Sequence, residues 1–416
     1  MFFVRICIEL TSLLQLPAEI ALSVETRGYA RVPATNYLVP CMNSDKLTSY
    51  RERRCPSHCM LALQSESAFV FWPSRTAAAM PTTLQESIPV LSSDEVISRL
   101  RKNGNALNKP FRAMYSSVLN GIITDVSFML VPIDDHMVHR GHGVFDTAII
   151  SNGHLYELDA HLDRLLRSAS MAKINPPFSR QELRDILVKT AAVSKAKDGL
   201  LRYWLSAGPG GFNLSSHECP TASFYAVVHD LMEESTEPVK VITSSVPMKS
   251  PFFATMKSVN YLPNALALLE AEEQGAFAGI WVDEQGFVAE GPNTNVAFVT
   301  ASGELLMPEV GKILAGCTAR RLLSIAEDSL NGLRPPIDNL KAVSVRPILA
   351  EEAKRASEMM MIGSGLPVVP VIQWDTQQIG NGQPGPVTLA LKALLEEHIL
   401  ADSSSHHERI PYDVYA

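Results

Sequence analysis

One lysine and one glutamate stand out in the sequence because both follow apolar residues. Lys257 comes after Phe-Phe-Ala-Thr-Met, and Glu290 ends a short apolar run before Gly-Pro-Asn. Burying an ammonium group is costly unless the group is paired or used. A partly buried lysine loses its proton more readily, and the neutral amine is a nucleophile towards aldehydes. Lys257 is therefore a candidate for covalent catalysis, and Glu290 is a candidate acidic partner.

Both residues also have an ordinary structural interpretation, which residue types alone favour. Lys257 can begin a loop with its ammonium group in water and its stem on the core. Glu290 can be a solvated strand end. If Lys257 is functional, its chemistry suits a Schiff base with pyridoxal 5′-phosphate (PLP), a cofactor whose ring nitrogen then needs an acidic partner.

Two later segments carry groups that could bind a phosphate. A turn containing Gly316 leads through Cys317 and Thr318 into a helix predicted for residues 319–330. Helix starts offer free backbone N–H groups at the positive end of the helix dipole. A buried strand predicted from residue 358 ends at Gly-Ser-Gly, where Ser364 adds a hydroxyl group. Each signal alone is weak.

Composition limits the class of protein. The chain has 416 residues, of which 46% are hydrophobic and 19% are charged, as expected for globular domains with real cores. The net charge of −8 argues against a nucleic-acid or anionic-membrane partner. No apolar run is long enough to predict a membrane span. The six cysteines show no disulfide framework, so a reduced, intracellular protein is expected. The Cys55-Pro-Ser-His-Cys59 cluster lacks a second pair, and no metal site is predicted.

The pattern along the chain predicts two folded domains. Residues 1–85 lack a persistent period and are expected to be a disordered extension or a targeting segment, unless translation starts at Met80. Residues 86–230 are expected to form strands and helices in alternation, which predicts a small α/β domain. One strand is expected over 128–133, and helices are expected over 159–171 and 180–194. Residues 231–238 are acidic, end in proline and are typical of a linker. Many short strands predict a larger, barrel-like domain over residues 239–402, with a C-terminal tail over 403–416.

From about residue 90 onwards the chain resembles the fold-type IV PLP enzymes. This group includes D-amino-acid aminotransferases, branched-chain aminotransferases and aminodeoxychorismate lyases, and the likeness is closest to the plant D-amino-acid-aminotransferase-like proteins. The motifs that carry it occur in the expected order: HMVHRGHGVFDTA (136–148), ELDAHLDRLLRSA (157–169), MKSVNYLPN (256–264), VAEGPNTNVAF (288–298), ILAGCTARR (313–321) and EMMMIGSG (358–365). The resemblance implies a two-domain α/β fold of α+β type, with a small domain and a larger pseudo-barrel domain.

The resemblance also implies roles for individual residues. Lys257 matches the lysine that holds PLP as a Schiff base, and Glu290 matches the carboxylate at the pyridine nitrogen. Arg164 matches an arginine that binds the cofactor phosphate, although a solvated arginine or a pair with Asp163 is the default for a helix position. Three further residues match donors to the same phosphate, namely Cys317, Thr318 and Ser364.

Substrate residues are implied less directly. Arg202 aligns with an arginine that branched-chain members use for a substrate carboxylate, and an outward-facing strand arginine is an equal alternative. Tyr261 and Phe145 are expected to line the site, as are Arg140 and His142. The bacterial D-amino-acid enzymes carry an Arg and a His after this strand, whereas this chain reads GPGGFNLSS.

The expected function is a PLP-dependent aminotransferase that moves the amino group of a D-amino acid, such as D-alanine, to a 2-oxo acid. An aminodeoxychorismate lyase that forms p-aminobenzoate, and a branched-chain-type aminotransferase, are the alternatives. The resemblance implies small-molecule amino acids and 2-oxo acids as partners, and a homodimer. The chloroplast is the expected location, or the cytoplasm if Met80 is the true start.

Overall fold

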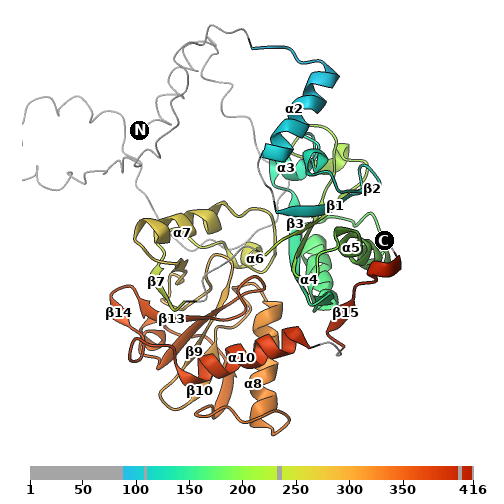
Figure 1. The fold of residues 1–416 in the computed structure, drawn as a ribbon. Coiled ribbons are helices and arrows are strands. Elements are labelled where there is room, and N and C mark those ends of the chain that lie inside the picture. The colour runs from blue at the N-terminus through green and yellow to red at the C-terminus, as the bar shows by residue number, and fades with distance from the viewer. Residues whose placement is uncertain (1–87, 107–109, 232–236, 402–404, 415–416) are drawn as a thin grey trace, which may run out of the picture. The chain divides into compact units, whose positions relative to one another are not determined.

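The structure is a computed structural model that describes residues 88–106, 110–231, 237–401 and 405–414. The extension predicted for residues 1–85, with Cys55, Cys59 and Met80, lies outside the described residues. Residues from Ile88 onwards form one compact unit that contains two β-sheets (Figure 1). Among the described residues, no helix combines the length and the apolar character that crossing a bilayer requires.

The first sheet is antiparallel and has the strand order β15-β4-β3-β5-β6-β1-β2. Its strands are β1 (Phe111–Ser116), β2 (Gly121–Ile123), β3 (Gly143–Ser151), β4 (His154–Tyr156), β5 (Gly199–Ser206), β6 (Ser223–His229) and β15 (His407–Arg409). Two helices, α4 (Leu158–Met171) and α5 (Arg180–Ser194), pack on it through a core that contains Leu162, Leu165 and Leu187. The apolar stripe at helical spacing therefore faces this sheet, as expected.

Tight turns and caps fix the ends of these elements. Asn152 and Gly153 both have positive φ, 46° and 76°, between β3 and β4, as a two-residue hairpin turn requires. Ser179 and Glu182 form a capping box at the start of α5. The same region holds α2 (Ser93–Ala106), the short helix α3 (His136–Arg140), and the 3-10 turns η2 (Val126–Phe128) and η3 (Ser216–Glu218).

The strand expected over residues 128–133 is wrong. The chain forms η2, whose N-cap Asp125 accepts a hydrogen bond from the Ser127 backbone N–H, and then continues without regular structure. Leu130 and Ile133 are exposed, so no partner strand covers them. Pro132 has no N–H to give to a sheet.

The second sheet is mixed, with the order β11-β10-β9-β12-β13-β7-β8, and β14 pairs with β13. Parallel pairs join β10 with β11, β13 with β7, and β7 with β8. The strands are β7 (Val239–Thr243), β8 (Ala278–Ile280), β9 (Asn295–Val299), β10 (Glu304–Met307), β11 (Ala342–Val345), β12 (Glu358–Ile362), β13 (Val369–Trp374) and β14 (Gln377–Gln378).

Both faces of this sheet are covered. Met360 and Ile362 pack in one core with α8 (Cys317–Leu330) and α10 (Pro386–Leu400), while Met359 and Met361 face a second core. Successive strand residues point to opposite faces, which explains the unbroken apolar run of β12. The remaining helical elements are α6 (Pro251–Ala254), α7 (Leu262–Glu273), α9 (Ala350–Ala353) and η4 (Tyr412–Val414).

The C-terminal residues return to the first sheet. Within the segment expected to be a tail, β15 pairs with β4, and the Tyr412 hydroxyl donates to the Ala196 carbonyl at 2.5 Å. Glu408 of β15 also forms an ion pair with Arg184 of α5 at 2.5 Å. The exact limits of the two domains stay a prediction.

Candidate active site

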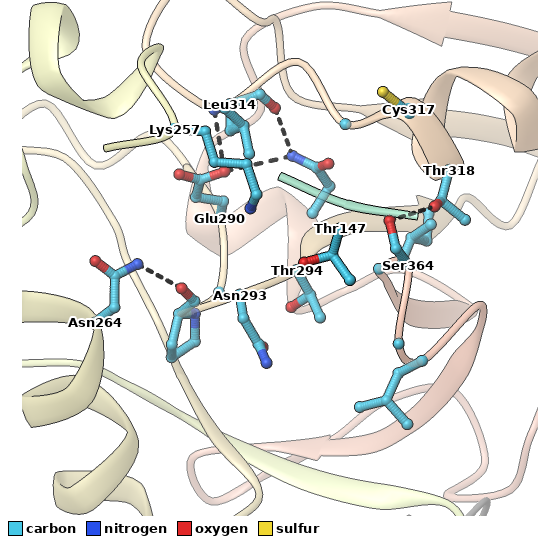
Figure 2. A pocket seen from close by; sticks show the side chains of 18 of the residues that line it. Thr147, Lys257, Asn264, Glu290, Asn293, Thr294, Leu314, Cys317, Thr318 and Ser364 are labelled. Carbon is cyan, nitrogen blue, oxygen red and sulfur yellow. Dashed lines mark hydrogen bonds between the residues drawn. The ribbon is translucent and has the colours of Figure 1, made fainter. Parts of the chain in front are cut away.

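The predicted cofactor residues and most of the predicted substrate residues line one cavity of about 360 Å³. From the first sheet and its helix come Phe145, Arg164 and Arg202, and from the rest of the chain come Lys257, Tyr261, Glu290, Cys317, Thr318 and Ser364. Figure 2 shows Lys257 and Glu290 on one side of this pocket, with Thr318 and Ser364 on the other. Residues more than 200 positions apart therefore meet in one place.

Backbone hydrogen bonds fix Lys257 beside the start of β3. Its carbonyl accepts from the Phe145 N–H at 2.9 Å, and the Val259 N–H donates to the Gly143 carbonyl at 3.0 Å. Because β4 pairs only with the end of β3, the Lys257 segment occupies the edge that β4 leaves open. The Lys257 N–H also donates to Ser168 Oγ at 3.2 Å, which ties the segment to α4.

Two aromatic rings position the lysine side chain. Lys257 Nζ lies 3.3 Å from the Tyr261 hydroxyl and 4.7 Å from the centre of the Phe145 ring. The two rings pack edge to face, with centroids 5.0 Å apart. The amine is half-buried and has no carboxylate within 4.0 Å among the described residues, so its nitrogen is available to a ligand.

Glu290 is a buried acid whose negative charge is only partly compensated by the groups around it. Its side chain accepts from the Leu314 N–H at 3.1 Å and from Asn295 Nδ2 at 3.4 Å, and the residue is 7% exposed. Burial raises the pKa of Glu290 to about 7, although Lys249 and the Leu314 N–H act in the opposite direction. A carboxyl group in this state can share a proton with a ring nitrogen.

Arg164 is held by a buried network that sequence reasoning missed. Its Nε and Nη2 donate to the two carboxylate oxygens of Asp146 at 2.8 and 2.7 Å, and His161 Nδ1 lies 2.8 Å from the same carboxylate. Burial would raise the pKa of Asp146, but Arg164 and His161 hold it well below its usual range. The expected default partner, Asp163, instead pairs with Arg180 at 2.7 Å on the surface.

Arg164 retains a donor for an anion. Its Nε and Nη2 are turned towards Asp146 and His161, and Nη1 gives one hydrogen to the Ala315 carbonyl at 3.2 Å. A guanidinium has five N–H donors, so the second hydrogen on Nη1 remains. Ala315 directly precedes Gly316, the N-cap of α8, so the arginine lies beside the positive end of that helix.

The start of α8 has the features of a phosphate site. Thr318 Oγ1 lies 3.3 Å from Ser364 Oγ, and both hydroxyls line the pocket. At Gly316 a Cβ would lie 2.0 Å from Asn295 Oδ1, so a larger residue would displace the Asn295 side chain that contacts Glu290. Burial would raise the pKa of the Cys317 thiol, but His161 and Arg164 lower it.

Arg202 is a half-buried cation without an acidic partner. It lies on β5 opposite Thr147, and its Nε donates to Thr147 Oγ1 at 3.2 Å. Burial lowers the pKa of Arg202. Among the described residues, no carboxylate comes within 4.0 Å of it, so the guanidinium is free to bind an anion.

Two expected wall residues lie elsewhere. Arg140 donates to the carbonyls of His139 and Phe212, and neither Arg140 nor His142 lines the pocket within the described ranges. His142 contacts His136 and the Ala172 carbonyl. The same described ranges contain no group of three or more His, Cys, Asp or Glu side chains arranged for a metal ion.

Comparison with known proteins identifies the family. The model for amino-transferase class IV matches residues 143–374, more than half of the chain. The chloroplastic D-amino-acid transaminase of Arabidopsis thaliana is 54% identical over 330 residues, which cover 78% of this chain and 86% of that protein. The chain belongs to the class IV amino-transferase family. This membership confirms the predicted resemblance and the prediction of a transaminase.

More distant relatives agree on the fold. A D-alanine aminotransferase of Bacillus licheniformis is 28% identical, with 69% of this chain and 98% of that protein covered. A branched-chain amino acid aminotransferase of Thermobaculum terrenum, solved in its PLP form, superposes with a TM-score of 0.62 at 20% identity, covering 70% of this chain and 95% of that one. The predicted two-domain α/β fold class is confirmed.

Proposed function

We propose that the protein is a PLP-dependent transaminase that transfers the amino group of a D-amino acid, such as D-alanine, to a 2-oxo acid. The observation that carries this proposal is the 54% identity to a D-amino-acid transaminase. The convergence of the predicted cofactor and substrate residues on one pocket supports it.

The pocket residues fit PLP. Thr294 Oγ1 and Asn264 Oδ1 belong to pocket-lining residues, are buried, and have no hydrogen-bond partner among the described residues. Buried polar atoms without partners are rare in native proteins, so a ligand that supplies partners is expected. Thr318, Ser364 and the N-terminus of α8, with Arg164 beside them, would hold the phosphate.

The protein groups have separate tasks in the reaction. When bound, PLP supplies an aldehyde for the amino group and a ring that stabilises negative charge at the α-carbon of the substrate. Glu290 would hold the ring nitrogen in its protonated form. Lys257 Nζ would move the proton at the substrate α-carbon, with the Tyr261 hydroxyl 3.3 Å away to orient the amine.

Arg202 is the proposed ligand of a substrate carboxylate. The bacterial-type Arg and His are missing after β5, whereas Arg202 lies within the pocket and lacks an acidic partner among the described residues. A guanidinium binds a carboxylate through two parallel hydrogen bonds. This assignment supplies the carboxylate site that the missing pair leaves open.

A coupled assay for pyruvate tests the proposal. The full-length chain is incubated with PLP, D-alanine and 2-oxoglutarate, with L-alanine and L-leucine as parallel donors. Formation of pyruvate from the D-isomer alone is the expected result. Turnover of L-leucine instead would replace the proposal with a branched-chain-type transaminase. No turnover of any donor by protein that retains PLP would move the assignment to the carbon–carbon lyase.

The assembly and the location follow as further parts of the proposal. Phe252 and Phe253 of α6 and Leu262 and Leu266 of α7 are exposed apolar residues, and such a group is typical of a surface that another subunit covers. We propose that they contribute to a homodimer, which light scattering after size-exclusion chromatography would measure. The name of the Arabidopsis relative supports a chloroplast location, which a fluorescent fusion of the full chain would test.

A further inference from the structure

A second cavity, of about 310 Å³, lies between α4 and α8. The helix residues that line it recur at helical spacing, namely Ala160, Asp163, Arg164 and Arg167 of α4, and Gly316, Ala319, Arg320 and Leu323 from the N-cap of α8 onwards. Positions i, i+3, i+4 and i+7 share one face of a helix. Leu162 and Leu165, which pack on the first sheet, belong to another face of α4. The cavity is therefore a groove between two helix faces, and we call it the α4–α8 groove.

A thin wall separates the α4–α8 groove from the active-site pocket. Arg164 and Asn295 line both cavities. Arg164 Nη1 donates to the Ala315 carbonyl at 3.2 Å, and Asn295 Nδ2 donates to the Leu314 carbonyl at 3.0 Å. These two hydrogen bonds hold the wall in place. Lys257 lines only the active-site pocket within the described residues, so the groove is a separate site.

Most of the surface of the α4–α8 groove is apolar. Its larger apolar side chains are Met307, Pro308, Val310, Leu314, Leu323 and Val345. Val310 is 51% exposed and Val345 is 48% exposed, so a ligand that covers them would remove apolar surface from water. The volume lies at the lower end of the range of about 300–1,000 Å³ that is typical of small-molecule sites. The groove therefore suits a small molecule with an apolar body.

The charges of the α4–α8 groove favour an anion. Arg167 and Arg320 are exposed, and neither has a carboxylate within 4.0 Å among the described residues. Asp163 is the one carboxylate among the described residues that line the groove, and it pairs with Arg180 at 2.7 Å. A guanidinium binds a carboxylate through two parallel hydrogen bonds. Each helix thus offers an unpaired arginine to a carboxylate.

We propose that the α4–α8 groove binds a small amphipathic carboxylate. The apolar body of the ligand lies against Val310, Leu323 and Val345, and its carboxylate pairs with Arg167 and Arg320. The inference does not depend on the proposed transaminase function, because the groups assigned to the reaction itself do not line the groove within the described ranges; they are Lys257, Glu290 and Arg202.

The test is calorimetric titration of the full-length holoprotein with 4-phenylbutyrate and with its neutral amide, 4-phenylbutanamide. The double variant Arg167→Met, Arg320→Met keeps two unbranched apolar stems and removes both charges. An exposed ion pair corresponds to roughly a 1.4- to 5-fold change in affinity, so the double variant should bind the acid roughly 3- to 25-fold more weakly. The affinity for the amide should change less than about twofold, because the amide carries no charge.

Three further variants locate the bound acid. Arg355→Met removes an exposed arginine that lines neither cavity, and the affinity for the acid should stay unaltered. Arg202→Met removes a cation of the active-site pocket, and binding in the α4–α8 groove should persist. Val345→Trp fills the groove from an exposed strand position and keeps both arginines. It should weaken the acid and the amide alike, by at least about 10-fold.

Three results would overturn the proposal. The first is equal affinity for the acid in the double variant and the unaltered protein. The second is weaker binding in Arg202→Met with none in the double variant, which would place the acid in the active-site pocket. The third is no binding of the acid to the unaltered protein at millimolar concentration, as when a second copy of the chain covers the groove. Because the readout is binding, failure of the transaminase assay leaves this test intact.

Discussion

Replacing Asp146 with asparagine would test the buried network that holds Arg164. The variant keeps the shape of the side chain but removes the negative charge between Arg164 and His161, which contact the carboxylate at 2.7–2.8 Å. Asp146 has no exposed surface, and Arg164 and His161 are almost completely buried. The variant therefore removes the carboxylate that neutralises Arg164 and His161 in the interior.

The size of the effect follows in two ways. Removing one partner of a buried ion pair costs about 3–5 kcal/mol. The shift of His161 has the same direction: burial would lower its pKa, but Cys317 and Asp146 raise it from 6.5 to about 9, so Asp146 supplies part of about 3 kcal/mol favouring the charged form. We expect the free energy of unfolding to fall by about 3–5 kcal/mol and Tm to fall by roughly 4–7 °C for a unit of this size.

The pH dependence of stability has a defined sign. The folded-state pKa of His161 is raised. Its contribution to the free energy of unfolding is therefore complete below the unfolded pKa of 6.5 and is lost as the pH rises through about 9. The folded-state pKa of Asp146 is lowered, so Asp146 stabilises the folded protein above its unfolded pKa, and this stabilisation disappears only in strong acid. The variant should therefore lose most stability relative to the unaltered protein near pH 6, and less above pH 9.

The assay is thermal unfolding of the cofactor-free protein, with the affinity for PLP measured by fluorescence quenching. Asp163→Asn is the matched control, since Asp163 lies on the same helix as Arg164 but pairs with Arg180 on the surface. Such a surface pair contributes at most about 1 kcal/mol. The reasoning is refuted if the two variants have the same Tm, or if PLP binds Asp146→Asn as tightly as the unaltered protein.

Other variants test single groups of the pocket. Lys257→Ala should abolish transamination and covalent retention of PLP. Persistent turnover would contradict the assignment of Lys257 as the lysine that binds PLP. Arg202→Met should raise KM for the donor at least 10-fold with a smaller change in kcat, since it removes a binding contact. An unchanged KM would show that Arg202 does not bind the substrate. Glu290→Gln should stabilise the cofactor-free protein by about 3 kcal/mol at pH 8 and little at pH 4.5, because a raised carboxyl pKa costs stability as the pH rises from 4.5 through about 7. Equal stability of this variant and the unaltered protein at both pH values would contradict the burial argument.

Much of the site could be predicted because its residues lie at the ends of regular elements. Thr318 follows a glycine at the start of α8, and Ser364 follows β12 within Gly-Ser-Gly. The hydrophobic period fixes where the flanking helix or strand ends, so these positions can be located without a structure. Lys257 and Glu290 could be identified as candidates because the apolar residues before them made their charges unusual.

The partner of Arg164 could not be predicted because it depends on packing between distant segments. Adjacent helix residues point about 100° apart, so Asp163 cannot face Arg164 on the same side of α4. Asp146 comes from β3, and only the packing of α4 on the first sheet brings the two together. Asp146 directly follows Phe145 in the sequence, where nothing distinguishes a buried carboxylate from an exposed strand end.

Lys249 escaped prediction for a similar reason. It lies between Met248 and Ser250, in a segment with no regular period, and a lysine there is ordinarily solvated. Its position over Tyr261 depends on the anchoring of the loop by Glu270 and Trp281. Loop conformation follows from tertiary contacts, so a loop residue that lines a pocket is hard to find from sequence alone.

The two buried carboxylates of the site, Asp146 and Glu290, differ in how far the protein compensates their charge. Asp146 is surrounded by cations, so its charge is compensated and its pKa is lowered. Among the described residues, Glu290 accepts hydrogen bonds only from the Leu314 N–H and the Asn295 amide, and burial raises its pKa to about 7 against the opposing effect of Lys249. A protein selected for stability alone would replace such an acid with a neutral residue of the same shape. Glu290 is therefore the carboxylate that the proposal pairs with a ligand, whereas Asp146 already has its partners within the fold.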